Sequence, residues 1–239
     1  MLRTIVFDVD GTLVDSVDLH ARCWQEAFAR YGRQVDFRKI RNQIGKGGDL
    51  LIPHFLPEEE NERWGEELDR FRSELFQERY LQKVRPFPKV KELFERIRAD
   101  GKSVALASSG KDVEIDHYIE LLGVKALVDV RTTSDDAERS KPFPDIFAAA
   151  LEKVWVEGPD EALVVGDSPF DAEAAGRLTV PCVGVLCGGF DPEDLRRAGC
   201  IALFRAPADL LERYPQSPLA RDGRAVRAGV EEGQPPAIV

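Results

Sequence analysis

The sequence predicts an α/β protein in which a doubly wound parallel sheet carries an inserted, all-helical domain. Five short apolar runs have the length of strands, and their continuous apolar character is typical of strands covered on both faces. Segments with a period of 3.6 residues separate the later runs and indicate helices. One long interval after the first run contains charged, helix-favouring segments and no convincing strand, which indicates an insertion.

The expected strands lie at residues 4–7, 104–107, 126–130, 162–165 and 180–186. The expected helices between the later strands lie at residues 90–99, 113–122, 145–154 and 171–178. Strands that alternate with helices in this way build a parallel, Rossmann-like sheet with helices on both faces.

The predicted domains follow from this order. Residues 1–15 and 84–215 form the expected sheet domain, and residues 16–83 form the helical insertion, with helices near 19–31 and 58–81. Pro86 and Pro88 mark the return to the sheet. Beyond Tyr214 the composition shifts to Pro, Gly, Arg and Glu without periodicity, so residues 216–239 are expected to be a flexible tail.

Composition indicates a soluble globular protein of 239 residues, with 43% hydrophobic and 32% charged residues. The apolar start lacks a basic leader and a cleavage site, and no apolar run approaches the roughly 20 residues that span a bilayer. The four cysteines occur without a Cys-x-x-Cys pair or nearby histidines, so we expect reduced thiols in a cytoplasmic protein. These cysteines are Cys23, Cys182, Cys187 and Cys200.

The formal net charge of -10 limits the kinds of partner that we expect. Nucleic-acid binding relies on clustered Lys and Arg, so a DNA or RNA partner is not expected. A small anionic substrate remains compatible with this charge if a few cations gather in one pocket.

Polar residues follow the predicted strands where a ligand would bind. In an open parallel sheet, ligands bind beyond the carboxyl ends of the strands. The segments there, or in a loop before a later helix, are Asp8-Val9-Asp10-Gly11-Thr12, Ser108-Ser109-Gly110, Lys141-Pro142 and Gly166-Asp167-Ser168-Pro169-Phe170-Asp171. The sequence therefore predicts a polar site at this edge of the sheet.

This set of residues suits phosphoryl transfer, which needs a nucleophile, an acid for the leaving oxygen and cations for the developing charge. Asp8 can attack and form an aspartyl-phosphate. Asp10 can protonate the leaving alkoxide and then activate water. Acids this close together repel one another unless a cation bridges them, and Mg²⁺ accepts such oxygen ligands. Asp167 arrives from another strand and completes a cation site.

Each segment also has a purely structural interpretation. Asp-x-Asp is common in turns and caps, and Ser108-Ser109-Gly110 alone predicts only a helix N-terminus. Lys141 could be a solvated loop lysine, and the segment from Gly166 to Asp171 could be a turn before a capped helix. Their joint occurrence in sheet order favours a site.

The four segments, in this order, resemble the four motifs of the haloacid dehalogenase superfamily over roughly residues 2 to 210, most specifically from Asp8 to Ser16. The resemblance implies Asp8 as nucleophile and Asp10 as acid/base. It implies Mg²⁺ held by the Asp8 carboxylate, the Asp10 carbonyl and Asp167, with Asp171 orienting the metal waters. It also implies that Ser108, Ser109 and Gly110 hold the phosphoryl oxygens, and that Lys141 neutralises the nucleophile and the phosphate.

The insertion resembles a helical cap that selects the leaving group in this superfamily. Residues 44–51 resemble the corresponding loop of the phosphoglycolate phosphatase branch, so Lys46 is the expected substrate-facing cation, with an exposed helix-start lysine as the alternative. Residues 15–20 resemble the hinge of β-phosphoglucomutases, where a histidine sits near the acid/base. His20 is therefore a candidate substrate-binding residue, with a surface histidine as the alternative.

The expected function is a Mg²⁺-dependent phosphatase acting on a small phosphorylated metabolite, of the phosphoglycolate or sugar phosphate type, as a monomer or homodimer. A β-phosphoglucomutase-like phosphomutase is the first alternative, although the mutase loop resembled here normally offers an arginine and this sequence has Gly48-Asp49 in that neighbourhood. A haloacid dehalogenase is a further alternative, but its motif resembles Asp-x-Tyr and it uses no Mg²⁺. A phosphate-binding relative without turnover is the last.

Overall fold

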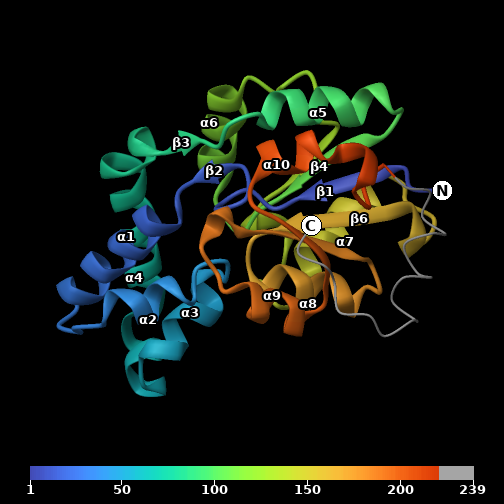
Figure 1. Cartoon of the computed structure of the whole chain (residues 1–239). Coiled ribbons are helices and arrows are strands. Elements are labelled where there is room, and N and C mark those ends of the chain that lie inside the picture. Colours follow the sequence, from blue (N-terminus) through green and yellow to red (C-terminus); the bar gives the residue numbers. More distant parts are fainter. Residues whose placement is uncertain (221–239) are drawn as a thin grey trace.

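The computed structural model describes residues 1–220 and has a six-stranded parallel sheet at its centre (Figure 1). The strand order is β5-β4-β1-β6-β7-β8, so the first strand lies in the middle, between β4 and β6. The strands are β1 Thr4–Phe7, β4 Ser103–Ala107, β5 Val130–Thr132, β6 Ala162–Gly166, β7 Cys182–Val185 and β8 Cys200–Phe204. The predicted α/β class with a parallel sheet is confirmed.

Both faces of the sheet are covered, which explains the continuous apolar runs. In β1, Ile5 and Phe7 pack into one core cluster, whereas Val6 between them packs into the other. Side chains alternate between the faces of a strand, so a strand buried on both sides needs apolar residues throughout.

Helices α5, α6 and α10 cover one face of the sheet, and α7, α8 and α9 cover the other (Figure 1). Their bounds are α5 Val90–Ala99, α6 Asp112–Leu122, α7 Asp145–Lys153, α8 Pro169–Arg177, α9 Pro192–Ala198 and α10 Pro207–Glu212. The four helices predicted between the later strands are all present within two residues of their expected bounds.

The inserted helices form a cap beyond the carboxyl ends of the strands (Figure 1). They are α1 Val17–Arg30, α2 Phe37–Arg41, α3 Gly48–Phe55 and α4 Glu58–Arg79. A short antiparallel pair, β2 Val14–Asp15 with β3 Arg85–Pro86, joins the two ends of the insertion to the sheet domain. The cap has its own core, in which Trp24, Phe28 and Leu68 are buried.

The structure differs from the prediction at two strands. The run at 126–130 is mostly turn, and the strand begins only at Val130, because Leu127 and Val128 pack against the core from the loop. The edge strand β8 was not predicted, although residues 200–204 form a short apolar run; Ile201 and Ala202 in it are only partly covered.

The predicted tail from 216 onwards begins with ordered packing, because Leu219 is fully buried in the larger core cluster. The rest of that prediction, residues 221–239, lies outside the described residues. All four cysteines are free. Within residues 1–220, no helix combines the length and apolar character needed to cross a bilayer.

Candidate active site

Lys141 and Asp8 meet at the carboxyl edge of the sheet. Lys141 is fully buried, and its Nζ donates hydrogen bonds to Asp8 Oδ1 and, at 2.8 Å, to Asp171 Oδ1. Burial acts to lower the pKa of Lys141, but the charges of Asp171 and Asp8 outweigh it and raise the pKa above its ordinary value. The side chain is therefore a fixed cation beside the predicted nucleophile.

Asp8, Asp167 and Asp171 form a buried cluster of acids. One carboxylate oxygen of each lies within 4.8 Å of the others. Burial raises the pKa of Asp8 to about 7 against the opposing charge of Lys141, and it raises the pKa of Asp167 well above the usual range. The site holds three carboxylates and only one ammonium group, that of Lys141, so negative charge is in excess. Hard carboxylate oxygens in this arrangement fit a divalent cation such as Mg²⁺.

Two glycines allow the backbone to close around Asp167. A Cβ at position 188 would lie 1.6 Å from Asp167 Oδ2, and one at Gly11, which has φ +84°, would lie 2.4 Å from the same atom. Thr12 Oγ1 lies 3.0 Å from Asp8 Oδ2 and 3.2 Å from Asp167 Oδ1, so its single proton is shared between them. The surrounding chain thus holds this carboxylate in one place.

Asp171 is occupied by the protein itself. Its Oδ2 accepts hydrogen bonds from the backbone N–H and the hydroxyl of Ser168, which forms a capping box at the start of α8. Its Oδ1 accepts from Lys141. Asp171 thus accepts three hydrogen bonds from the protein, which favours a role in orienting the neighbours of a cation.

The Asp10 carboxylate points away from the acid cluster and toward the cap. It accepts hydrogen bonds from Ser16 Oγ at 2.5 Å and Ser108 Oγ at 3.4 Å, and its Oδ1 lies 2.9 Å from His20 Nε2. Burial acts to raise the pKa of Asp10, but the contacts with His20 and Ser16, together with the charge of Arg72, lower it to about 2. Asp10 is therefore ionised, and its carboxylate is not part of the acid cluster.

His20 lies between Asp10 and Arg72. Arg72 Nη2 lies 3.0 Å from His20 Nδ1, and since a guanidinium has only donors, Nδ1 must accept and Nε2–H must donate to Asp10. The ring is buried and stacks on Phe76, with ring centroids 3.9 Å apart. His20 thus contacts the predicted acid/base directly.

Sequence reasoning missed Arg72, which projects from α4 of the cap. It also faces Glu114, a fully buried acid on α6, with Nη1 3.8 Å from Oε1. The helix α4 carries charges on all sides, so no pattern in the sequence showed which of them face inward. Only the packing of α4 against the sheet domain shows that Arg72 lies near Asp10 and His20.

The residues predicted to hold phosphate lie at the turn before α6. Ser108 Oγ accepts a hydrogen bond from Gly110 N at 3.0 Å, and Ser109 Oγ donates to Gly45 O of the cap at 3.4 Å. A small cavity brings these groups next to the acids and the lysine. Its lining includes Asp8, Asp10, His20, Ser109, Gly110 and Lys141.

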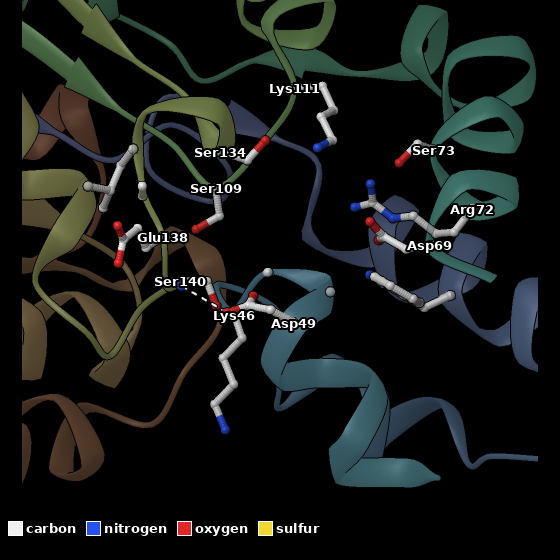
Figure 2. Close-up of a pocket in the computed structure, with 15 residues that line it drawn as sticks. Lys46, Asp49, Asp69, Arg72, Ser73, Ser109, Lys111, Ser134, Glu138 and Ser140 are labelled. Atoms are coloured by element: carbon white, nitrogen blue, oxygen red, sulfur yellow. Dashed lines mark hydrogen bonds between the residues drawn. The ribbon is translucent and has the colours of Figure 1, made fainter. Parts of the chain in front are cut away.

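Lys46 lines this cavity, but its ammonium group is engaged elsewhere. Nζ donates to Gln43 Oε1 at 2.6 Å and lies 4.6 Å from the centroid of the Phe170 ring. Figure 2 shows the side chain pointing away from the pocket, whereas Arg72 points into it. In this conformation Arg72, rather than the predicted Lys46, is the cap cation nearest to the reacting groups.

A second pocket of about 200 Å³ adjoins this cavity between cap and core (Figure 2). Trp24, Lys46, Arg72 and Ser109 line both. Its further charged and hydroxyl-bearing walls come from Asp49, Asp69, Ser73, Lys111, Ser134, Glu138 and Ser140. The leaving group of a substrate bound at Asp8 would extend into this space.

Comparison with known proteins agrees with this geometry. The model of the haloacid dehalogenase-like hydrolase family matches residues 5–185. The chain belongs to this family. Its curated relatives include phosphoglycolate phosphatases, and a putative β-phosphoglucomutase from Bacteroides vulgatus, 20% identical, has a similar fold with a TM-score of 0.79 over 97% of this chain and 91% of its own. The expected superfamily and its hydrolase class are confirmed.

Individual members of the haloacid dehalogenase-like hydrolases show the extent of the similarity. A phosphoglycolate phosphatase from Yersinia pestis is 30% identical over 192 residues, which is 78% of this chain and 82% of the relative. A phosphorylated carbohydrates phosphatase from Thermotoga maritima is 25% identical, over 88% of this chain and 97% of the relative. The crystal structure of a hydrolase from Pseudomonas syringae has a TM-score of 0.80 and 29% identity, over 90% of this chain and 99% of its own.

Proposed function

We propose that this hydrolase is a Mg²⁺-dependent phosphatase that cleaves a small phosphomonoester through an aspartyl-phosphate on Asp8. The convergence of Lys141, Asp8 and Asp167 in one buried cluster carries the proposal. Curated relatives that are phosphatases of phosphoglycolate and of phosphorylated carbohydrates support it.

In the first half of the reaction, Asp8 attacks phosphorus and the ester P–O bond breaks. Asp10 gives a proton to the leaving oxygen, which departs as an alcohol. The pKa of Asp10 near 2 describes the site without substrate. A bound phosphoryl dianion places negative charge beside this carboxylate and raises its proton affinity. Lys141 offsets the charge on the nucleophile and on the phosphoryl oxygens.

In the second half, water attacks the aspartyl-phosphate and Asp10 takes its proton. The ionised state of Asp10, stabilised by Ser16 and His20, suits this role as a base. Inorganic phosphate leaves, and Asp8 returns to its carboxylate form.

Mg²⁺ would be held by the Asp8 carboxylate, the Asp10 carbonyl and Asp167, where it would neutralise charge on the phosphoryl oxygens. Asp171 would orient the neighbouring groups through its bonds to Lys141 and Ser168. The observation that fits this cation is the excess of negative charge among the three buried carboxylates.

The test is release of inorganic phosphate from a panel of phosphomonoesters, with p-nitrophenyl phosphate as a generic member, in the presence and absence of Mg²⁺. We expect Mg²⁺-dependent turnover that Asp8→Asn abolishes. No phosphate from any member of the panel, or full turnover by Asp8→Asn, would overturn the proposal.

A phosphomutase is the second candidate, because His20 contacts the acid/base in the way that the resemblance to β-phosphoglucomutases implies. A mutase must return the phosphoryl group to a second hydroxyl faster than water removes it. Interconversion of sugar phosphate isomers, primed by a bisphosphate and faster than phosphate release, would favour this candidate over the hydrolase.

A further inference from the structure

The pocket beside the catalytic cavity is larger than a two-carbon leaving group needs. Its 200 Å³ has room for on the order of ten water molecules. It begins at Arg72, which also borders the catalytic cavity, and extends along α4 and the core loops. The chemistry of its walls therefore bears on which leaving group fits.

Asp69 and Arg72 are the charged pair that α4 presents to this space. They stand one helical turn apart, so they share a face of the helix. Figure 2 shows both end groups directed into the pocket. Arg72 Nε is buried without a hydrogen-bond partner. Within residues 1–220, no group donates a hydrogen bond to the Asp69 carboxylate. The guanidinium of Arg72 and the carboxylate of Asp69 thus lie side by side along the pocket wall.

Gly48 makes room for the Asp69 carboxylate. A Cβ at position 48 would lie 2.4 Å from Asp69 Oδ1 and 2.8 Å from its carboxyl carbon. Any other residue there would displace the acid from the pocket wall. The glycine at the start of α3 therefore leaves room for an acid on α4 whose charge acts on Arg72 and whose carboxylate accepts no hydrogen bond within residues 1–220.

Other groups of the lining are also mixed donors and acceptors. Ser140 Oγ is buried and has no hydrogen-bond partner. Lys111 and Glu138 contribute opposite charges from the core side. Asp49 differs, because its carboxylate already accepts a hydrogen bond from the backbone N–H of Ser140.

This lining discriminates among leaving groups by their hydrogen-bonding capacity. A hydroxyl group both donates and accepts, so neighbouring hydroxyls satisfy a carboxylate and a guanidinium together. A second anion on the substrate would pair with Arg72 but would meet the charges of Asp69 and Glu138. An alkyl group would leave the polar walls without partners, which is costly.

We infer that this pocket binds the leaving group of a polyol or sugar phosphate, with Asp69 accepting from one hydroxyl and Arg72 donating to its neighbour. The inference rests on the proposed phosphatase function and narrows its substrate to esters of polyhydroxylated alcohols. Asp69 is then a specificity-determining residue that touches the substrate away from the reacting phosphorus.

The test compares two substrates that differ only in hydroxyl groups, glycerol 3-phosphate and n-propyl phosphate, together with 2-phosphoglycolate. We expect kcat/KM for glycerol 3-phosphate to exceed that for n-propyl phosphate by about ten- to a hundredfold. Asp69→Asn removes the charged acceptor and should lower this ratio by about tenfold, while raising relative activity on 2-phosphoglycolate. Glu74→Gln removes an exposed acid of the same helix and should leave the ratio unchanged.

The outcomes separate the two proposals. Because the ratio is taken within one variant, a partly unfolded variant does not change it. Hydrolysis of n-propyl phosphate as efficient as that of glycerol 3-phosphate, or a ratio unaffected by Asp69→Asn, overturns the inference and leaves the phosphatase intact. A preference for 2-phosphoglycolate over glycerol 3-phosphate in the wild type also overturns it. Absence of turnover on every ester overturns the phosphatase itself.

Discussion

The carboxylate of Asp49, on the cap, accepts a hydrogen bond of 3.0 Å from the backbone N–H of Ser140, the residue that precedes Lys141. On another side of the site, Arg41 of the cap donates to the carbonyl of Gly188 at 2.8 Å. These bonds therefore end on two core loops, one leading into Lys141 and one lying against Asp167. The two bonds tie the cap to core loops that adjoin Lys141 and Asp167.

The Asp49 bond predicts a difference between two substitutions. Asp49→Ala removes the acceptor and should lower kcat about three- to tenfold at saturating substrate and Mg²⁺, because the loop before Lys141 loses one anchor. Asp49→Asn keeps an acceptor oxygen and should retain most of the wild-type kcat. Steady-state kinetics of both variants make the comparison, and equal kcat values for the alanine and wild-type enzymes would show that the bond does not matter for turnover.

Asp10→Asn should separate turnover from metal binding. The carboxylate of Asp10 faces Ser16 and His20 rather than the acid cluster, so its loss leaves the oxygens proposed to hold Mg²⁺ in place. We expect turnover to fall by about 10²-fold or more, with the Mg²⁺ concentration for half-maximal effect nearly unchanged. Isothermal titration with Mg²⁺ and phosphate-release rates measure the two quantities, and unchanged turnover would refute the acid/base role.

The close approach of Gly188 to Asp167 predicts a metal defect from one added methyl group. A Cβ at 188 would occupy the place of the Asp167 carboxylate, so Gly188→Ala should raise the Mg²⁺ requirement strongly. Gly176→Ala is the matched control, because a Cβ at that helical position meets no atom within 4 Å. A Mg²⁺ titration of activity compares the two variants. An ordinary Mg²⁺ requirement in Gly188→Ala would mean that this loop moves away without consequence.

Much of the cluster around Asp8 was predictable because topology brings strand ends together. Asp8 and Asp167 follow β1 and β6, which are neighbours in the sheet, so their positions in the chain already implied their proximity. Lys141 reaches the cluster from a loop, and its burial between two acids could not be read from its neighbours in sequence. The structure supplied that contact.

The cap residues were less predictable, for a physical reason. Charged residues occur around the whole circumference of α4, so hydrophobic periodicity does not show that Asp69 and Arg72 face the pocket. Lys46 is a cation in the loop that was predicted to face the substrate, but its side chain contacts Gln43 and the Phe170 ring instead. The direction of a flexible side chain depends on neighbours from distant segments.

The metal-free protein should lose stability as pH rises from about 4 to 7, because burial raises the folded-state pKa of Asp8 from 3.8 to about 7. A carboxyl that binds its proton more tightly in the folded state stabilises the fold below its unfolded pKa, and this contribution is lost as pH rises through the folded pKa. The raised pKa of Asp167 acts in the same direction.

Mg²⁺ should therefore raise the Tm more at pH 7.5 than at pH 5, since at the lower pH protons compete for the same oxygens. Thermal unfolding with and without Mg²⁺ gives the Mg²⁺-induced change in Tm at each pH. Titrating groups that do not contact the metal affect both samples equally, so they do not contribute to this change. Asp8→Asn removes one buried charge and should reduce the pH dependence of the metal-free Tm between these values. A Mg²⁺ effect of the same size at pH 5 and pH 7.5 would mean that protons and metal do not share this cluster.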